Sequence, residues 1–191
     1  MAKKQVGVLS LQGAVLEHSR KLLQCKALPV EVRRPGDLDS LDGLIIPGGE
    51  STTIGMLMEK FALHEAIKKC CHNGMGIMGT CAGMVLLAQD VVDGKPEQPK
   101  LELMDIAVRR NAFGRQRESF EEELSIKGIE SSVRGVFIRA PLVEETGSRV
   151  EVLSTVEEGI VAVRQEKILG VSFHPELTEE TALHRYFLNL L

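Results

Sequence analysis

Three side chains of this sequence could act together in covalent catalysis, although they lie far apart along the chain. Cys81 stands between glycines in the segment Gly79-Thr80-Cys81-Ala82-Gly83, and His174 and Glu176 lie two residues apart near the other end. A thiol becomes an effective nucleophile when a base lies beside it and a third group orients that base. We therefore interpret Cys81 as a nucleophile, His174 as its base and Glu176 as the group that orients the base.

The glycines around Cys81 are typical of a sharp turn from a strand into a helix. Such a turn lifts its corner side chain out of the sheet, and a Cβ at either flanking position would clash, as in the serine elbow of α/β-hydrolases. A helix that begins at Ala82 would favour the thiolate, and the Ala82 N–H could stabilise an oxyanion. Taken alone, the motif fits a buried structural thiol equally well.

His174 and Glu176 are separated by a proline, which stiffens the segment. In an extended backbone, residues two apart point to the same side, so the carboxylate could fix the tautomer of the imidazole and stabilise the imidazolium. A strand expected at 168–173 would deliver the pair to the carboxyl edge of a sheet, where sites in open α/β sheets lie. Taken alone, the segment fits a structural histidine that pairs with a nearby acid in a loop better than it fits a catalytic pair.

Consecutive glycines follow another apolar run, in Pro47-Gly48-Gly49-Glu50. Glycines expose backbone N–H groups and let a ligand approach closely, so the Gly49 N–H is the candidate for a second oxyanion donor. The segment lacks the Gly-Lys-Ser/Thr ending of a phosphate-binding loop. A plain tight turn into a helix is the alternative.

The elements that must position these residues alternate in the first half of the chain. Short apolar runs with helical spacing between them call for a parallel sheet covered on both faces. The expected strands are 6–11, 29–33, 43–47 and 76–79. The expected helices are 14–26, with Val15, Leu16, Ser19, Leu22 and Leu23 near one face, 51–71, with Ser51 or Thr52 as its cap, and 82–89.

The second half of the chain contains mostly strand-like runs with short turns, which we interpret as antiparallel additions to the sheet. The expected strands are 103–109, 135–138, 150–153, 160–165 and 168–173, followed by a helix at 179–190 with Thr178 as its cap. The segment 93–100 is expected to be a surface loop. The pattern predicts an α/β protein with a flavodoxin-like three-layer fold and a mostly parallel central sheet.

The composition limits the class of protein. A chain of 191 residues with 43% apolar residues fits one domain, at 1–191. A net charge of −4 argues against a nucleic-acid-binding protein, because no long basic stretch exists to neutralise phosphates. No apolar run is long enough for a signal peptide or a membrane span, so we expect a cytoplasmic protein whose four cysteines are reduced.

Other cysteines and histidines carry less weight. Cys70-Cys71-His72 lacks the paired two-residue spacing of a zinc site, so we expect packed thiols at a helix end, and neither a metal nor a cofactor. His64, His72 and His184 lie on predicted helices and are expected at the surface or in packing. His18 also lies on a predicted helix and is expected to have the same structural role. A position near the site or at an interface is the alternative for this residue.

Six segments together resemble one family, the glutaminase subunits of pyridoxal 5′-phosphate synthases, which are class I, triad-type glutamine amidotransferases. The resemblance runs from the first strand to the last helix. It differs at Leu16, where members of this family often carry a basic residue. The segments are LQGA at 11–14, PGGESTT at 47–53, GTCAG at 79–83, RNAFGRQ at 110–116, GVFIRAP at 135–141 and SFHPELT at 172–178.

The resemblance implies hydrolysis of L-glutamine. Cys81 would attack the side-chain amide carbon, His174 would carry protons for the thiol, the departing ammonia and water, and Glu176 would orient His174. The N–H groups of Gly49 and Ala82 would hold the oxyanion. The resemblance further implies that glutamine is bound by Gly48, Gly49, Glu50, Arg110, Ile138 and Arg139.

The product also implies a partner. Neutral ammonia protonates quickly in water at neutral pH, so it must pass directly to an acceptor site, and this chain has no room for a second catalytic domain. The resemblance implies a (β/α)8-barrel synthase subunit that builds pyridoxal 5′-phosphate and activates the glutaminase when it docks. A flip of the Gly48–Gly49 peptide is our hypothesis for that activation.

Three alternatives stay open at this point. One is the glutaminase subunit of another amidotransferase, such as imidazole glycerol phosphate synthase, which would have the same triad. Another is a flavodoxin-like cysteine peptidase or chaperone, which the late His174-Pro175-Glu176 segment disfavours. The last is a non-catalytic scaffold of the same fold, which the presence of Cys81, His174 and Glu176 disfavours.

Overall fold

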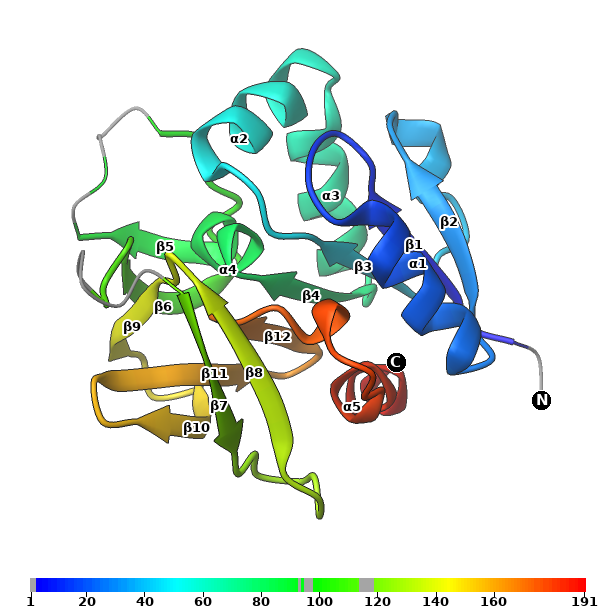
Figure 1. Ribbon diagram of the computed structural model, residues 1–191. Coiled ribbons are helices and arrows are strands. Elements are labelled where there is room, and N and C mark those ends of the chain that lie inside the picture. Colours follow the sequence, from blue (N-terminus) through cyan, green and yellow to red (C-terminus); the bar gives the residue numbers. More distant parts are fainter. Residues whose placement is uncertain (1–2, 93, 95–97, 114–118) are drawn as a thin grey trace.

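The computed structural model describes residues 3–92, 94, 98–113 and 119–191. Its centre is a set of parallel strands in the order β2-β1-β3-β4-β12 (Figure 1). Every residue of β3, β4 and β12 is buried, which is typical of strands covered on both faces. The bounds are β1 Gln5–Leu9, β2 Leu28–Val32, β3 Gly43–Ile46, β4 Gly76–Thr80 and β12 Ile168–Val171.

Helices cover both faces of these strands. Alternate residues of β3 point to opposite sides, so Leu44 and Ile46 join one core while Ile45 joins the other. The first core is closed by α2 (Ser51–Lys60), α3 (Leu63–His72) and α4 (Ala82–Leu87), and the second by α1 (Val15–Gln24) and α5 (Ala182–Leu190). This is the three-layer arrangement that the alternating pattern predicted. Among the described residues, no helix is long and apolar enough to cross a membrane.

Antiparallel strands extend the sheet beyond β12, as predicted for the second half of the chain. The order continues β12-β11-β9-β6-β5, and β10 pairs with β11; the outermost pair, β5 and β6, is parallel. The bounds are β5 Ala88–Val91, β6 Met104–Arg109, β9 Leu142–Thr146, β10 Glu151–Val156 and β11 Gly159–Gln165.

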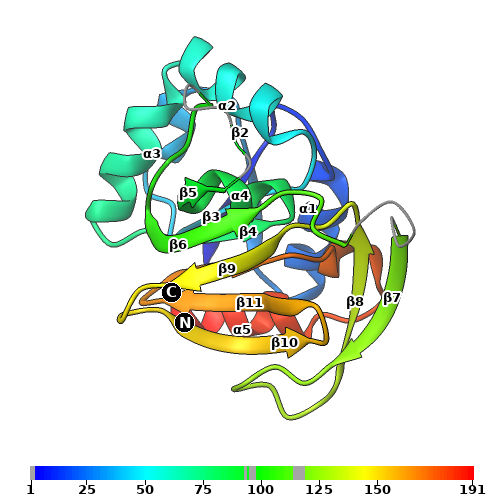
Figure 2. The same ribbon diagram turned by 90° about the vertical axis from the view of Figure 1, so that its left-hand side faces the viewer.

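Two further strands, β7 (Ser119–Leu124) and β8 (Val133–Ile138), form a separate antiparallel hairpin. Figure 2 shows this hairpin at one side of the antiparallel strands. Its inner face packs through aromatic rings: Phe120 stacks on Phe137 at 4.6 Å between centroids, and Phe137 lies 5.6 Å from Phe173. This packing brings the hairpin against the segment that follows β12.

Several expected elements were wrong in extent. The helix expected at 51–71 is two helices, because Ala62 adopts a left-handed conformation with φ 55°, and no glycine or proline signals that break. The helix expected at 82–89 ends at Leu87 and passes directly into β5. The last helix begins at Ala182, with Thr181 and not Thr178 as its N-cap. Strands β5, β7 and β9 were not predicted, and two short 3-10 helices lie at Pro35–Leu38 and Pro175–Leu177.

The face of α1 was predicted correctly only in part. Leu16 and Leu23 are 62% and 58% exposed, whereas His18 and Lys21 are buried with Leu22. Leu22 and Val15 do pack against the core, so the apolar residues mark the buried side of this helix only in part. Part of the loop expected at 93–100 lies outside the described residues, but Gln98 is buried rather than on the surface.

Candidate active site

Cys81 occupies the sharp turn between β4 and α4 that its flanking glycines predicted. Its φ of 51° and ψ of −107° lie in a region that side-chain-bearing residues rarely adopt. A Cβ at Gly79 would lie 2.6 Å from the backbone of Gly83, and a Cβ at Gly83 would lie 2.1 Å from the carbonyl oxygen of Ile46. Both glycines are therefore required for the turn to pack against the neighbouring strand.

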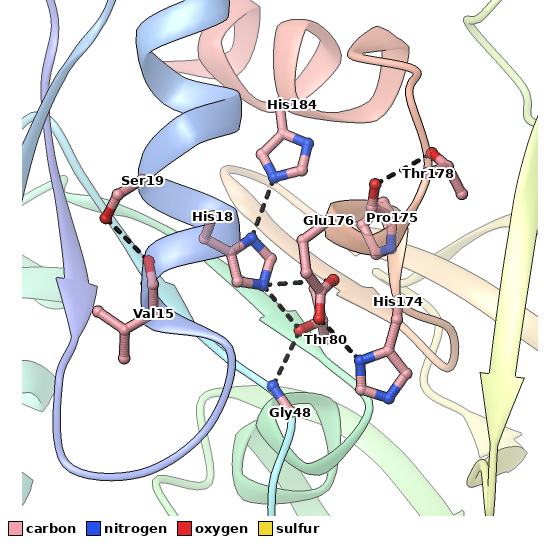
Figure 3. Close-up of polar contacts among 10 residues, drawn as sticks. All are labelled: Val15, His18, Ser19, Gly48, Thr80, His174, Pro175, Glu176, Thr178 and His184. Atoms are coloured by element: carbon pink, nitrogen blue, oxygen red, sulfur yellow. Dashed lines mark hydrogen bonds and ion pairs between the residues drawn. The ribbon is translucent and has the colours of Figure 1, made fainter.

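His174 and Glu176 follow the parallel strand next to β4. The His174 N–H donates to the Val136 carbonyl of β8 at 2.8 Å, which fixes the backbone at this point. The His174 Nδ1 lies 2.7 Å from Glu176 Oε1, in a pair that Figure 3 draws. This contact leaves Nε2 as the ring nitrogen that can exchange a proton with another group.

Gly48 lies where His174 and Cys81 approach each other. A Cβ at this position would lie 2.4 Å from His174 Cε1 and 3.4 Å from Cys81 Cβ. A hydrogen bond fixes the backbone of Gly48, whose N–H donates to Thr80 Oγ1 at 3.1 Å. The structure therefore brings the cysteine, the histidine and the first of the paired glycines into one small volume.

The electrostatics of this cluster favour a charged histidine. Burial lowers the pKa of His174, but hydrogen bonding and charge at Cys81 and Glu176 outweigh it and raise that pKa to about 10. Burial raises the pKa of Glu176, but the hydrogen bond and positive charge of His174 act in the opposite direction, and the pKa lies below its ordinary value. An imidazolium between a thiolate and a carboxylate is the form that a cysteine nucleophile requires.

A cavity of about 110 Å³ opens beside Cys81. Its lining includes both residues expected to supply oxyanion donors, Gly49 and Ala82. It also includes most residues expected to bind glutamine, namely Gly49, Glu50, Arg110, Ile138 and Arg139. Gly48 is not part of the described lining, because it is buried beneath His174. The segment 114–116 of the RNAFGRQ motif lies outside the described residues.

Glu50 has two structural roles at the rim of this cavity. Its carboxylate accepts from the N–H groups of Thr52 at 3.1 Å and Thr53 at 2.7 Å, so Glu50 caps α2, and the expected caps Ser51 and Thr52 were wrong. The same carboxylate lies 3.3 Å from Arg110 Nη2. Burial raises the pKa of Glu50, but the hydrogen bonds that it accepts from Thr53 and Thr52 lower the pKa by more than burial raises it. The carboxylate therefore stays charged.

Three supporting residues were not predicted from the sequence. Gln12 Oε1 accepts from the Glu50 N–H at 2.9 Å and packs against Gly49. Gln98 donates to Ser51 Oγ at 3.1 Å and accepts from Arg110 Nη1 at 3.2 Å, so it orients the guanidinium. Thr80 holds Gly48, as described above. Single polar residues of this kind have no spacing that distinguishes them from surface residues.

Comparison with known proteins decides the family. The family model described as the SNO glutamine amidotransferase family matches residues 8–191. The chain belongs to this family. This amidotransferase is 54% identical, over 98% of both chains, to the pyridoxal 5′-phosphate synthase subunit PdxT of Desulforudis audaxviator. It is 52% identical to the PdxT of Frankia alni, over 100% of this chain and 96% of that one.

A solved structure agrees with this assignment. The amidotransferase superimposes on a crystal structure described as a glutamine amidotransferase with a TM-score of 0.93 and 49% identity, over 97% of each chain. The fold class predicted from the alternating pattern is confirmed.

Proposed function

We propose that this chain is the glutaminase subunit of a pyridoxal 5′-phosphate synthase, which hydrolyses L-glutamine to L-glutamate and ammonia and passes the ammonia to a synthase subunit. One observation carries the chemistry. Cys81 stands at a strained turn beside a cavity, and His174, paired with Glu176 at 2.7 Å, lies against it. The relatives that are named as PdxT over the full length of the chain support the pathway.

The first half of the reaction forms a thioester. The Cys81 thiolate attacks the side-chain amide carbon of glutamine, and the carbonyl oxygen becomes an oxyanion that the N–H groups of Gly49 and Ala82 stabilise. The His174 imidazolium then donates its Nε2 proton to the amide nitrogen. The carbon–nitrogen bond breaks, ammonia leaves, and a glutamyl thioester with neutral His174 remains.

The second half restores the enzyme. Neutral His174 accepts a proton from water as the oxygen attacks the thioester carbonyl, and the same N–H groups hold the second oxyanion. The carbon–sulfur bond then breaks, glutamate leaves, and the thiolate remains beside the protonated histidine. Glu176 keeps Nδ1–H of His174 fixed throughout, so that Nε2 always faces the reacting atoms.

Charged groups at the rim of the cavity fit the two ends of an amino acid. The Arg110 guanidinium matches the α-carboxylate in a bidentate geometry, and the Glu50 carboxylate matches the α-ammonium. In the free protein these two side chains lie 3.3 Å apart. Glutamine would insert its own opposite charges between them. Ile138 and Arg139 would close the other side of the cavity.

The fate of ammonia belongs to the same proposal. We propose that residues 1–191 form a single glutaminase domain and that the ammonia passes to a (β/α)8-barrel synthase subunit. A cytoplasmic location also belongs to this proposal and stays a prediction.

A glutaminase assay tests the proposal. Glutamate release should be slow with this chain alone and should rise when the barrel subunit is added, but not when the synthase subunit of imidazole glycerol phosphate synthase is added. Cys81→Ala should remove glutamate formation and leave binding of the barrel subunit intact. Glutamate formation that survives in Cys81→Ala would falsify the mechanism.

A further inference from the structure

A pair of buried histidines lies behind the triad and has no part in the reaction described so far. His18 of α1 and His184 of α5 are both 0% exposed, and His18 Nδ1 lies 3.0 Å from His184 Nε2. Figure 3 shows a series of contacts that runs from His184 through His18 and Glu176 to His174. Two fully buried imidazoles in contact are costly unless each ring nitrogen has a defined role.

The other nitrogen of His18 faces the triad carboxylate. His18 Nε2 lies 3.4 Å from Glu176 Oε2 and 3.3 Å from Thr80 Oγ1. Among the described residues, Oε2 has no well-formed hydrogen bond, whereas Oε1 is paired with His174. The protonation state of His18 Nε2 therefore determines whether Glu176 Oε2 faces an N–H or a lone pair.

The contacts select one tautomer. Burial lowers the pKa of both His18 and His184, so each ring is neutral and carries one N–H. A proton on His18 Nδ1 would leave the Nε2 lone pair facing a carboxylate oxygen. A proton on Nε2 lets that N–H be shared between Glu176 and Thr80, and lets the Nε2–H of His184 donate to His18 Nδ1.

The surroundings of His184 Nδ1 also favour the Nε2–H tautomer of His18. His184 Nδ1 has no hydrogen-bond partner among the described residues. In the selected arrangement that atom is a bare lone pair, whereas in the alternative it is a buried N–H. Both rings are closed off from solvent, and a buried N–H without an acceptor is rarer in folded proteins than a buried acceptor without a donor, so the selected arrangement is favoured.

We propose that His18 is a positioning residue of the active site, which holds Glu176 and the Gly48 loop in register through the N–H on its Nε2. The chain of contacts is short: His18 to Glu176 Oε2 on one side, and His18 to Thr80 Oγ1, which accepts the Gly48 N–H at 3.1 Å, on the other. One imidazole thus connects the group that orients the base with the loop that carries an oxyanion donor. The inference rests on the proposed function.

Charged and titratable groups around His18 come from three parts of the fold. Glu17 and Lys21 flank it on α1, His174 and Glu176 face it from the segment after β12, and His184 faces it from α5. Glu176 is the carboxylate in direct contact, so loss of the His18 N–H should act first on Glu176 and through it on His174. The thiolate of Cys81 depends in turn on His174.

The test compares His18→Leu with His18→Gln. The leucine keeps the volume and removes the N–H, whereas the glutamine amide can place an N–H near the position of Nε2. His18→Leu should lower kcat for glutamine in the complex with the barrel subunit roughly tenfold to a hundredfold, with KM within about twofold, because the base is displaced and substrate contacts are not. His18→Gln should recover most of that loss.

A second readout needs no glutamine. The rate at which iodoacetamide alkylates Cys81, followed by mass spectrometry of its peptide, reports the thiolate as a function of pH. His18→Leu should move the acid limb of this profile to higher pH, and His18→Gln should restore it. The matched control is Leu22→Ala, a buried change on the same helix that should lower stability and leave the profile where it is.

The tautomer itself is measured in the unaltered protein. Nitrogen-15 NMR of the protein with labelled histidine should show His18 as the neutral Nε2–H form between pH 7 and 8. An Nδ1–H form, or a His18→Leu profile that coincides with that of Leu22→Ala, overturns the proposal even if glutaminase activity is normal. Absence of glutaminase activity in the wild-type complex would instead count against the proposed function, since the alkylation and NMR results do not depend on it.

Discussion

Arg110 and Glu50 form an ion pair at the rim of the cavity, with 3.3 Å between Nη2 and Oε1. They are also the two residues proposed to hold the opposite charges of glutamine. The free protein therefore keeps both groups charged and close together, with Gln98 bracing the guanidinium at 3.2 Å. In the proposed complex, glutamine would replace this ion pair with two new ones, one to each end of the amino acid.

Arg110→Lys should raise KM for glutamine with a smaller effect on kcat. A lysine keeps the charge but loses the planar fork that pairs with a carboxylate. Loss of one charge-assisted hydrogen bond is worth about 1.5–3 kcal/mol, which corresponds to roughly a tenfold to hundredfold rise in KM. Steady-state glutaminase kinetics in the complex measure it. An unchanged KM would place the α-carboxylate elsewhere.

Gly48→Ala should inactivate the enzyme without unfolding it. The new Cβ would lie 2.4 Å from His174 Cε1, so the imidazole must move away from Cys81. Displacing a base by about 1 Å costs on the order of a hundredfold in kcat. Gly36→Ala is the matched control, because a Cβ there meets nothing within 4 Å and should leave kcat unchanged. Equal activity of the two variants would contradict the placement of His174.

The backbone strain at Cys81 predicts a stability effect. A φ of 51° with ψ of −107° costs a side-chain-bearing residue about 1–3 kcal/mol, and glycine avoids most of that cost. Cys81→Gly should therefore be more stable than Cys81→Ala by roughly 1 kcal/mol, although both lack the nucleophile. Urea denaturation of the two variants measures the difference. A more stable alanine variant would show that the turn carries no strain.

The raised pKa of His174 predicts how stability changes with pH. A folded-state pKa of about 10, compared with an ordinary value of 6.5, stabilises the fold fully below pH 6.5. This contribution is lost as the pH rises from 6.5 through about 10. Cys81→Ser, whose hydroxyl does not ionise in this range, removes one cause of the shift. Its unfolding free energy should fall less steeply over that pH interval than that of the wild type.

The parallel half of the fold was predictable because its strands are continuous apolar runs with glycine or proline at their ends. The antiparallel half was less so. Strand β7 consists of Ser-Phe-Glu-Glu-Glu-Leu, and its run of charged residues conceals a strand that forms by pairing with β8. The break between α2 and α3 at Ala62 depends on tertiary packing, since that sequence has no helix-ending residue.

The reacting residues were predictable because their chemistry demands recognisable neighbours. Cys81 needs glycines to make its turn, and Glu176 needs to lie two residues from His174. The supporting residues have no such requirement. Thr80, Gln98 and His18 act through hydrogen bonds to partners that are mostly far along the chain, and a lone polar residue gives no sign in the sequence of its burial.

The β7–β8 hairpin links specificity to reactivity. Ile138 ends β8 and is followed by Arg139, and both line the cavity, while the Val136 carbonyl two residues earlier accepts the His174 N–H at 2.8 Å. The same hairpin therefore lines the cavity proposed to bind glutamine and fixes the backbone position of His174. A change in this hairpin that admits a different amide substrate would also shift the base. Redesign of this enzyme for new substrates has to treat the two properties as one.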